Sequence, residues 1–171
     1  CPPVTKKLPV WRPELYFLTL LAEQLGRSGI ITESINLGSV PGNAAQLVSI
    51  KRPVGKIVNV MLKRSDNLSG ENLLKYLGHR YTGKQGSAED GALVISDYLK
   101  ANGIPFERLR IADGSGMSHY NLSNAETIVR LLAAVYSDKS IYNEFANSLP
   151  VAGQDGTLVK RMKGTPAEGK L

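Results

Sequence analysis

Cysteine is nearly absent from this chain of 171 residues, in which Cys1 is the only example. A single cysteine cannot form an internal disulfide, so a fold held together by disulfides is excluded. Because chain ends are usually loose, Cys1 is also a poor candidate for a functional thiol. Long apolar runs are missing too: none approaches the ~18 residues of a membrane-spanning helix, and the start of the chain does not read as a signal peptide. We therefore expect no membrane span in this chain.

Charge of one sign is nowhere concentrated. The chain has 21 basic and 15 acidic residues and a net charge of +6, but the basic residues are scattered in pairs such as Lys63-Arg64 and Lys160-Arg161. No aromatic residues alternate with them as stacking platforms for bases would require. We expect a solvated basic surface and no nucleic-acid partner, while attraction to an anionic polymer such as cell wall stays open.

Residues that bind metals or cofactors are also scarce. The two histidines, His79 and His119, are too few and too far apart for a zinc site. Gly114 and Gly116 form a Gly-x-Gly, but neither the third glycine nor the Lys-Ser/Thr pair of a nucleotide-binding loop follows. The sequence therefore predicts neither a metal nor a cofactor.

Helical periodicity is what the chain does have, with 42% hydrophobic residues to form a core. The clearest apolar stripe combines Val54, Ile57, Val58, Met61 and Leu62 at spacings of three and four, which is typical of one helix face. Capping boxes at 87–90 and 123–126 mark two further helix starts. The other stripes predict helices at 13–25, 73–77, 93–99, 128–135 and 141–145, with stops at Gly26 and Gly78. We expect the stripes at 54–62, 73–77, 93–99 and 128–135 to converge on one core.

Strand signals are weak and number only two, at 46–51 and 108–111. So small a sheet is not stable by itself, so these strands would need partners from elsewhere. An unpaired edge could instead join a second copy of the chain, which leaves a homo-oligomer open. The predicted fold class is mainly α with a small β component. Residues 1–10, with three prolines and no periodicity, are interpreted as a linker before one domain at 11–171.

Ser65, Asp66 and Asn67 stand where one predicted helix ends and the next begins. All three residue types are favoured helix N-caps, so a cap is the simpler interpretation of the tripeptide alone. Ser-Asp-Asn is also one of three active-site motifs of penicillin-binding proteins and class A β-lactamases, beside Ser-x-x-Lys and Lys-Thr-Gly. The rest of the chain has to decide between the two.

Two later segments favour the active-site interpretation. The first is a turn formed by Asp113, Gly114, Ser115 and Gly116, which alone would be an ordinary glycine turn. The second is 148–158, which reads Ser-Leu-Pro-Val-Ala-Gly-Gln-Asp-Gly-Thr-Leu. A simple polar loop has no reason to specify so many positions.

In order and spacing, these segments resemble D-alanyl-D-alanine carboxypeptidases of the class C penicillin-binding protein family. The run at 61–74 is similar to that family's Ser-Asp-Asn segment, 113–118 to its Asp-Gly-Ser-Gly-Leu-Ser loop, and 148–158 to its Ser-Leu-Pro-x-Ala-Gly segment. The resemblance covers most of 11–171, loosely over the first forty residues. It implies the helical part of a β-lactamase/transpeptidase-like α/β domain.

The family's two other motifs are missing. No serine of this chain has a lysine three positions later, and Lys-Thr-Gly does not occur. In the family, Ser-x-x-Lys lies upstream of inserted domains, and Lys-Thr-Gly follows soon after a Gly-Lys-Leu like the one at 169–171. The resemblance therefore implies a central-to-late piece of a partial transpeptidase-like domain, and we expect this chain alone to be inactive.

The resemblance also implies roles for individual residues. In such families the serine of Ser-x-x-Lys attacks the D-Ala-D-Ala peptide bond. Ser65 would then relay a proton to the departing D-alanine, and Asn67 would hydrogen-bond the peptide backbone of the substrate. Asp66 is expected to cap its helix rather than react. Support of the substrate cleft is assigned to Asp66, Asp113, Gly114, Ser115 and Gly116.

Two functions stay open from the sequence. One is a piece of a serine D-Ala-D-Ala carboxypeptidase of the periplasm or cell envelope, with peptidoglycan peptides as partners and β-lactams bound by the intact parent. The other is a non-catalytic penicillin-binding-like module for cell-wall binding or scaffolding, which the missing nucleophile motivates. An upstream Ser-x-x-Lys and a downstream Lys-Thr-Gly in the reading frame would favour the enzyme.

Overall fold

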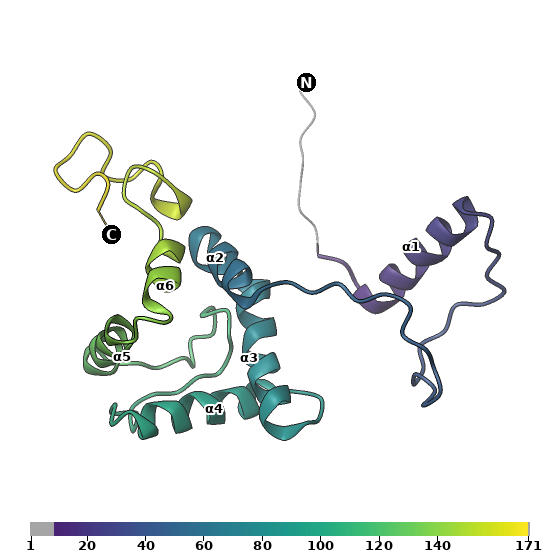
Figure 1. Cartoon of the computed structure of the whole chain (residues 1–171), viewed down its shortest axis with the longest axis horizontal. Coiled ribbons are helices and arrows are strands. Elements are labelled where there is room, and N and C mark those ends of the chain that lie inside the picture. The colour runs from purple at the N-terminus through teal and green to yellow at the C-terminus, as the bar shows by residue number, and fades with distance from the viewer. Residues whose placement is uncertain (1–8, 171) are drawn as a thin grey trace. The chain divides into compact units, whose positions relative to one another are not determined.

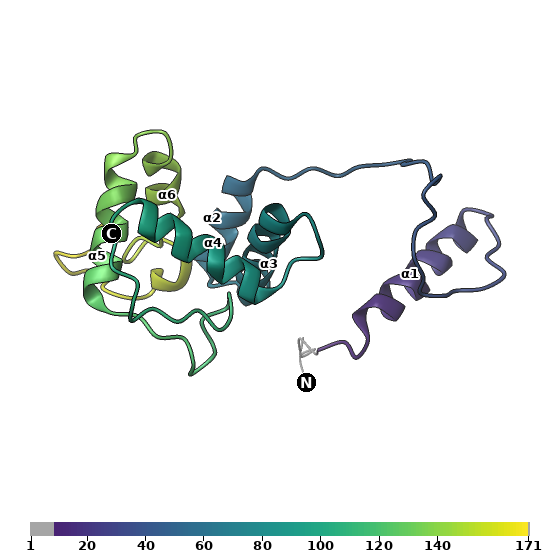
Figure 2. The ribbon, with the colours of Figure 1, turned by 90° about the horizontal axis from the view of Figure 1, so that it is seen from below.

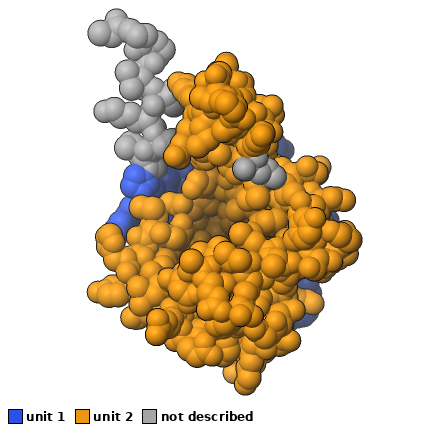
Figure 3. Space-filling model, turned by 90° about the vertical axis from the view of Figure 1, so that its left-hand side faces the viewer, with its two compact units in different colours: residues 1–49 blue, residues 50–171 orange. Residues whose placement is uncertain are grey.

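The computed structural model describes residues 9–170 and divides the chain into two compact units, 1–49 and 50–171 (Figure 3). The predicted linker at 1–10 falls mostly outside the described residues, and residues 9 and 10 have no regular structure. None of the helices that the structure describes is long and apolar enough to cross a membrane.

The first unit contains one described helix, α1 (Pro13–Arg27). Pro13 occupies its first turn, where a missing N–H costs nothing, and the helix ends one residue beyond the predicted stop at Gly26. The predicted strand at 46–51 is wrong, because these residues form no regular structure. A strand needs a neighbour for its backbone hydrogen bonds, and no described segment pairs with this one. The basis for an oligomer through a strand edge is lost with it.

The second unit is helical, which confirms the mainly α fold class (Figures 1 and 2). Within it, α3 and α4 pack against each other most extensively, α2 packs against α3, α6 and η1, and α5 packs against α6. The elements described in 50–170 are α2 (Val54–Arg64), α3 (Asn67–Thr82), α4 (Ala88–Ala101), α5 (Ala125–Ser137), α6 (Tyr142–Ser148) and a 3-10 turn, η1 (Gly156–Leu158).

Gly78 does not end α3, as its sequence position predicted. The helix continues to Thr82, and Gly83 ends it with a φ of 69°. Gly78 is buried where α3 meets α4: a Cβ atom there would lie 2.8 Å from the carbonyl oxygen of Ser87 and 2.9 Å from the amide nitrogen of Gly91. Its glycine serves close helix packing and not termination, which local sequence alone does not reveal.

The N-cap of the predicted capping box at 87–90 is confirmed, although the Asp90 carboxylate accepts the Ser87 hydroxyl and not the backbone N–H of a full box. Ser87 caps α4 by accepting a 3.0 Å hydrogen bond from the backbone N–H of Asp90. The box at 123–126 is displaced by one residue, because Asn124 and not Ser123 caps α5, accepting from the N–H of Thr127 at 2.9 Å. The Thr127 hydroxyl donates to the carbonyl oxygen of Pro105 at 2.6 Å, which fixes where α5 begins.

The buried apolar core of the described residues is small and consists of Leu74, Leu99, Ile104 and Ala152. The prediction that four stripes converge on one core is wrong for α2 and α5, because neither contributes a buried apolar residue; on α5, Ile128 and Leu132 are about half exposed. The reason is geometric: α5 packs against α6 alone among the principal helix contacts, so much of its apolar face is uncovered. One face of 50–171 is visibly hollowed (Figure 3).

The strand predicted at 108–111 reduces to a single antiparallel bridge between Arg110 and Leu122, whose two N–H···O distances are both 2.9 Å. This bridge closes the base of a loop, and the loop carries the turn at 113–116. The pairing thus holds that turn in place without forming a sheet.

Candidate active site

The junction between α2 and α3 consists of only two residues, Ser65 and Asp66. Ser65 caps the end of α2 with a φ of 54° and a ψ of 52°, the left-handed conformation that L-residues other than glycine seldom adopt. The N–H of Asp66 donates to the carbonyl oxygen of Met61 at 3.0 Å, which turns the chain sharply. Ser65 therefore stands at the apex of the helix junction, as the sequence predicted.

Asp66 caps α3, as its sequence context predicted. Its carboxylate accepts the backbone N–H of Ser69 at 2.9 Å and also the Ser69 hydroxyl. A carboxylate at this end of a helix also interacts favourably with the helix dipole. Asp66 thereby fixes the first turn of α3, which begins at Asn67.

Ser65 and Asn67, which precede and follow Asp66 in the sequence, are both exposed. Neither side chain forms a hydrogen bond to any of the residues that the structure describes. The hydroxyl of Ser65 and the amide of Asn67 therefore keep their donors and acceptors available for a ligand.

The turn at 113–116 is organised around the carboxylate of Asp113. It accepts hydrogen bonds from the backbone N–H of Gly116 and of Ser118, both at 2.7 Å, and from the side-chain amide of Asn121 at 2.9 Å. These bonds, the one from Asn121 foremost, hold the pKa of Asp113 below its ordinary value, although burial acts in the opposite direction. The Asn121 side chain also accepts the N–H of Ala112 at 2.7 Å, so the loop is tied together from within.

This turn lies against the first turn of α3, close in the chain to Asn67. The backbones of Gly70 and Gly114 approach so closely that a Cβ atom on either one would clash with the carbonyl oxygen of the other. The N–H of Ser115 donates to the carboxylate of Glu71 at 3.2 Å. The structure thus brings together the Ser-Asp-Asn and Asp-Gly-Ser-Gly segments, which are separated by more than forty residues.

The third segment, 148–158, packs against the last turn of α2. The ammonium group of Lys63 donates to the carbonyl oxygen of Leu149 and to the carboxylate of Asp155, both at 2.6 Å. The other oxygen of that carboxylate accepts the N–H of Val151 at 2.8 Å. Both bonds lower the pKa of Asp155, that from Lys63 more strongly. All three segments singled out from the sequence therefore meet around the α2–α3 junction.

Lys63 and Glu71 make contacts around the candidate site that the sequence did not predict. Each lies within the run at 61–74 that resembles a known motif segment, and Lys63 precedes Ser65 by two residues. That proximity was the available signal. Their partners, Asp155 and Ser115, are too distant in the chain for local patterns to identify.

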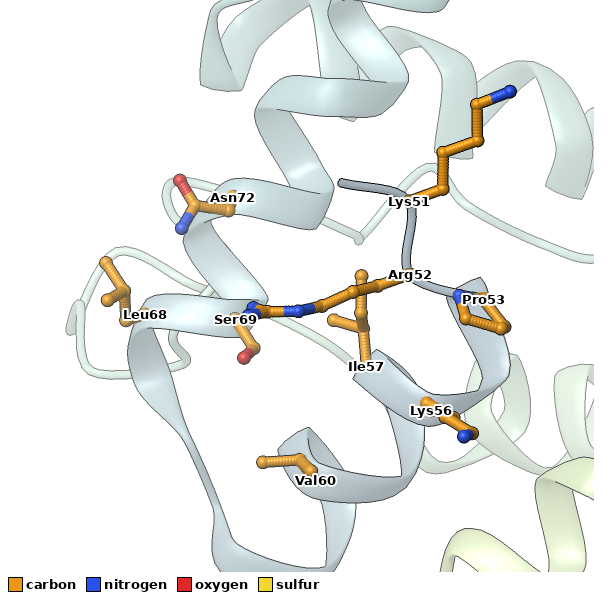
Figure 4. A pocket seen from close by; sticks show the side chains of 9 residues that line it. All are labelled: Lys51, Arg52, Pro53, Lys56, Ile57, Val60, Leu68, Ser69 and Asn72. Carbon is orange, nitrogen blue, oxygen red and sulfur yellow. The ribbon is translucent and has the colours of Figure 1, made fainter. Parts of the chain in front are cut away.

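A cavity of about 700 Å³ opens between α2 and α3 (Figure 4). In this view the side chain of Arg52 runs toward Ser69 and crosses that of Ile57. The residues that line it are Lys51, Arg52, Pro53, Lys56, Ile57, Val60, Leu68, Ser69 and Asn72. Ser65 and Asn67 are not among them, so the expectation that Ser65 faces a substrate cleft stays a prediction.

Comparison with known proteins agrees with the convergence of the three segments. The whole sequence, residues 1–171, matches the D-Ala-D-Ala carboxypeptidase 3 (S13) family. The chain belongs to this family. Among curated S13-like relatives, a D-alanyl-D-alanine carboxypeptidase from Actinomadura sp. (strain R39) is 32% identical over 98% of this chain. Penicillin-sensitive carboxypeptidase A of Dictyostelium discoideum is 27% identical over 95% of it.

A solved structure shares the fold of this S13 family chain. It is penicillin binding protein 4 (dacB) from Haemophilus influenzae complexed with a novel β-lactam, which matches with a TM-score of 0.85 and 25% sequence identity. The match covers 95% of this chain and 38% of that one. The chain spans about a third (32%) of the length of the curated relatives that it matches.

Proposed function

We propose that this chain is part of a serine-type D-Ala-D-Ala carboxypeptidase that acts on peptidoglycan stem peptides, and that it supplies Ser65 and Asn67 to the reaction. The observation that carries this most directly is the meeting of three distant motif segments at the α2–α3 junction, in a member of the S13 family. The carboxypeptidase names of its relatives support the same reaction class.

The chemistry of the two exposed side chains suits these roles. A serine hydroxyl donates and accepts a hydrogen bond at once, so Ser65 can pass a proton to the departing D-alanine. The amide of Asn67 offers a donor and an acceptor to the peptide backbone of the substrate. The hydrogen bonds of Asp66 and Asp113 fix the backbone around the α2–α3 junction, from which the two exposed side chains would reach a bound substrate.

The nucleophile must come from outside this chain. Acyl transfer needs an activated serine with a base in hydrogen-bond reach and an oxyanion hole, and the sequence contains no Ser-x-x-Lys. We assign the nucleophilic serine and its lysine base to the remainder of the intact parent. We expect β-lactams to acylate the parent at that serine. Because its substrate is peptidoglycan, the parent would work in the cell envelope, in the periplasm where there is one.

Substitution of the two side chains in the intact parent tests this function. Ser65→Ala and Asn67→Ala should each lower kcat/KM for a synthetic peptide ending in D-Ala-D-Ala by ~10²–10⁴-fold, the range for a lost positioned proton-transfer group. The melting temperature should change little, because neither side chain bonds to the described residues. Ser123→Ala is the matched control, since Ser123 is exposed and makes no described hydrogen bond.

If Ser65→Ala and Asn67→Ala turned the peptide over at the wild-type rate, a catalytic role for these residues would be wrong. A pronounced loss of thermal stability in the same variants would indicate that the tripeptide acts only as a helix cap. A wild-type parent that neither cleaves the peptide nor reacts with penicillin would favour the non-catalytic wall-binding module, which the absence of Ser-x-x-Lys motivates.

A further inference from the structure

Lys63 connects three segments of the second unit through one ammonium group. It lies in the last turn of α2, and its side chain is only 18% exposed, whereas that of Asp155 is 45% exposed. The ammonium donates to the carbonyl oxygen of Leu149, the residue that caps the end of α6, and to Asp155 in the following loop. Charge-assisted bonds of this length are among the stronger ones in proteins.

The backbone of Lys63 takes part in the same interface. Gly156 approaches its carbonyl oxygen so closely that a Cβ atom at Gly156 would lie 2.6 Å from it, and Gly156 has a φ of 55°. Gly156 therefore packs against the last turn of α2, the same turn whose Lys63 side chain binds the Asp155 carboxylate. Both the side chain and the backbone of Lys63 therefore contact the segment at 149–158.

We propose that Lys63 and Asp155 form a positioning clamp that sets the place of the Ser65 hydroxyl; this rests on the proposed function of Ser65. Only one residue separates Lys63 from Ser65, so a shift of the last turn of α2 moves Ser65 directly. Displacement of a reacting group by about 1 Å can cost ~10²-fold in rate. Lys63 is thus a positioning residue that acts through Ser65.

Arg64 supplies a matched comparison. It carries the same charge in the same helical turn, but it is exposed and forms no ion pair or hydrogen bond to the described residues. Lys63→Met and Arg64→Met therefore remove the same charge from the helix end, and only the first removes the clamp. Because Asp155 is partly exposed and keeps its bond from Val151, water can solvate it in Lys63→Met, and the variant should fold.

The experiment measures acylation of the intact parent by a fluorescent penicillin, together with hydrolysis of a D-Ala-D-Ala peptide, well below the melting temperatures. We expect Lys63→Met to lower the acylation rate constant about tenfold or more, with the loss of peptide hydrolysis in kcat rather than KM. Arg64→Met should stay within about twofold of wild type. Lys63→Arg should recover most of the rate, because arginine can still donate to both partners.

Asp155→Asn provides a second way to open the clamp, since the amide oxygen can still accept the Val151 N–H. It should lower acylation as Lys63→Met does, and the double variant should be no slower than either single one, because both remove the same contact. Acylation at the wild-type rate in Lys63→Met or in Asp155→Asn would overturn the proposal. So would an equal loss in Arg64→Met.

Hydrogen exchange separates this proposal from the function on which it rests. In Lys63→Met the bond from the Val151 N–H to Asp155 remains, but without Lys63 to hold the carboxylate it should open more often, so the Val151 amide should exchange faster than in wild type. In Arg64→Met the same amide should exchange at the wild-type rate, whether or not the parent is active. If wild-type parent failed to react with penicillin, the proposed function would be wrong, and unchanged exchange in Lys63→Met would then reject the clamp independently.

Discussion

At the scale of single residues, Ser65 keeps a conformation that its side chain does not favour. A left-handed backbone costs a non-glycine residue on the order of 1–3 kcal/mol, and glycine would relieve that cost. Glycine would also remove the hydroxyl. The strain at Ser65 (φ 54°) is consistent with a position where the side chain is needed and the surrounding caps determine the backbone.

Asp113 offers a prediction at the same scale, because its carboxylate organises the neighbouring turn. Hydrogen bonds from Asn121, and from Gly116 and Ser118, lower its pKa from 3.8 in the folded protein. A carboxylate with a depressed folded pKa stabilises fully above its unfolded pKa and loses that contribution as the pH falls through the folded value. Asp113→Asn should therefore lower the melting temperature of the intact parent at pH 7, and the difference from wild type should shrink below about pH 3.8.

Thermal unfolding followed by circular dichroism between pH 7 and 2.5 measures this difference. Asp97→Asn is the control, since Asp97 is exposed on α4 and has no hydrogen bond or ion pair to the described residues. It should melt like wild type over the whole range. A deficit in Asp113→Asn that is as large at pH 2.5 as at pH 7 would contradict the role of the carboxylate charge.

At the scale of helices, the sequence predicts which helices form better than it predicts the residues at which they end. Apolar periodicity and the Ser87 cap depend on interactions within a few residues, so the sequence alone predicts them. The six α-helices of residues 9–170 lie where the apolar stripes predict them. Gly78 was misread because its purpose is contact with α4. The strand prediction at 46–51 is wrong because a strand depends on a hydrogen-bonded neighbour, which local sequence does not reveal. The Lys63–Asp155 ion pair is not predictable from local sequence for the same reason. The three motif segments are recognised only through their resemblance to a known family.

The contact between Gly70 and Gly114 carries a prediction about these elements. Gly70→Ala in the intact parent should cost ~1–3 kcal/mol as an overpacking change, because the neighbouring atoms are backbone and cannot rotate away. It should also displace the turn at 113–116 from α3 and reduce peptide hydrolysis. Denaturant unfolding and activity, measured on the same preparation, check both effects.

Gly26→Ala on α1 is the matched control, since it has no atom within 4 Å of an added Cβ and lies in a helix. Alanine favours helices over glycine by about 1 kcal/mol, so this change should be neutral or stabilising. Both substitutions replace glycine by alanine within a helix, but Gly70→Ala should lower the free energy of unfolding and Gly26→Ala should not. Equal destabilisation by both would mean that the Gly70–Gly114 approach is unimportant.

At the scale of the molecule, the second unit has more apolar surface than its own helices cover. Leu93 on α4 and Val129 on α5 are both more than half exposed, although each lies on or beside a predicted stripe. Other apolar side chains on these two helices, Tyr98 on α4 and Ile128 and Leu132 on α5, are more than a third exposed as well. The chain spans about a third of its relatives' length, which agrees with further parts of a parent covering these faces.

The last prediction concerns this chain taken alone. Covalent reaction with a β-lactam needs a serine with a base in reach, and no serine here has a lysine three residues later. The isolated chain should therefore give no labelled band on a denaturing gel after incubation with fluorescent penicillin, whereas the intact parent should label stoichiometrically. Circular dichroism must first show that the isolated chain is helical, so that a missing label cannot be explained by an unfolded chain.

A stoichiometric adduct on the folded chain would mean that one of its own serines is the nucleophile. The assignment of Ser65 as a proton relay would then have to be given up.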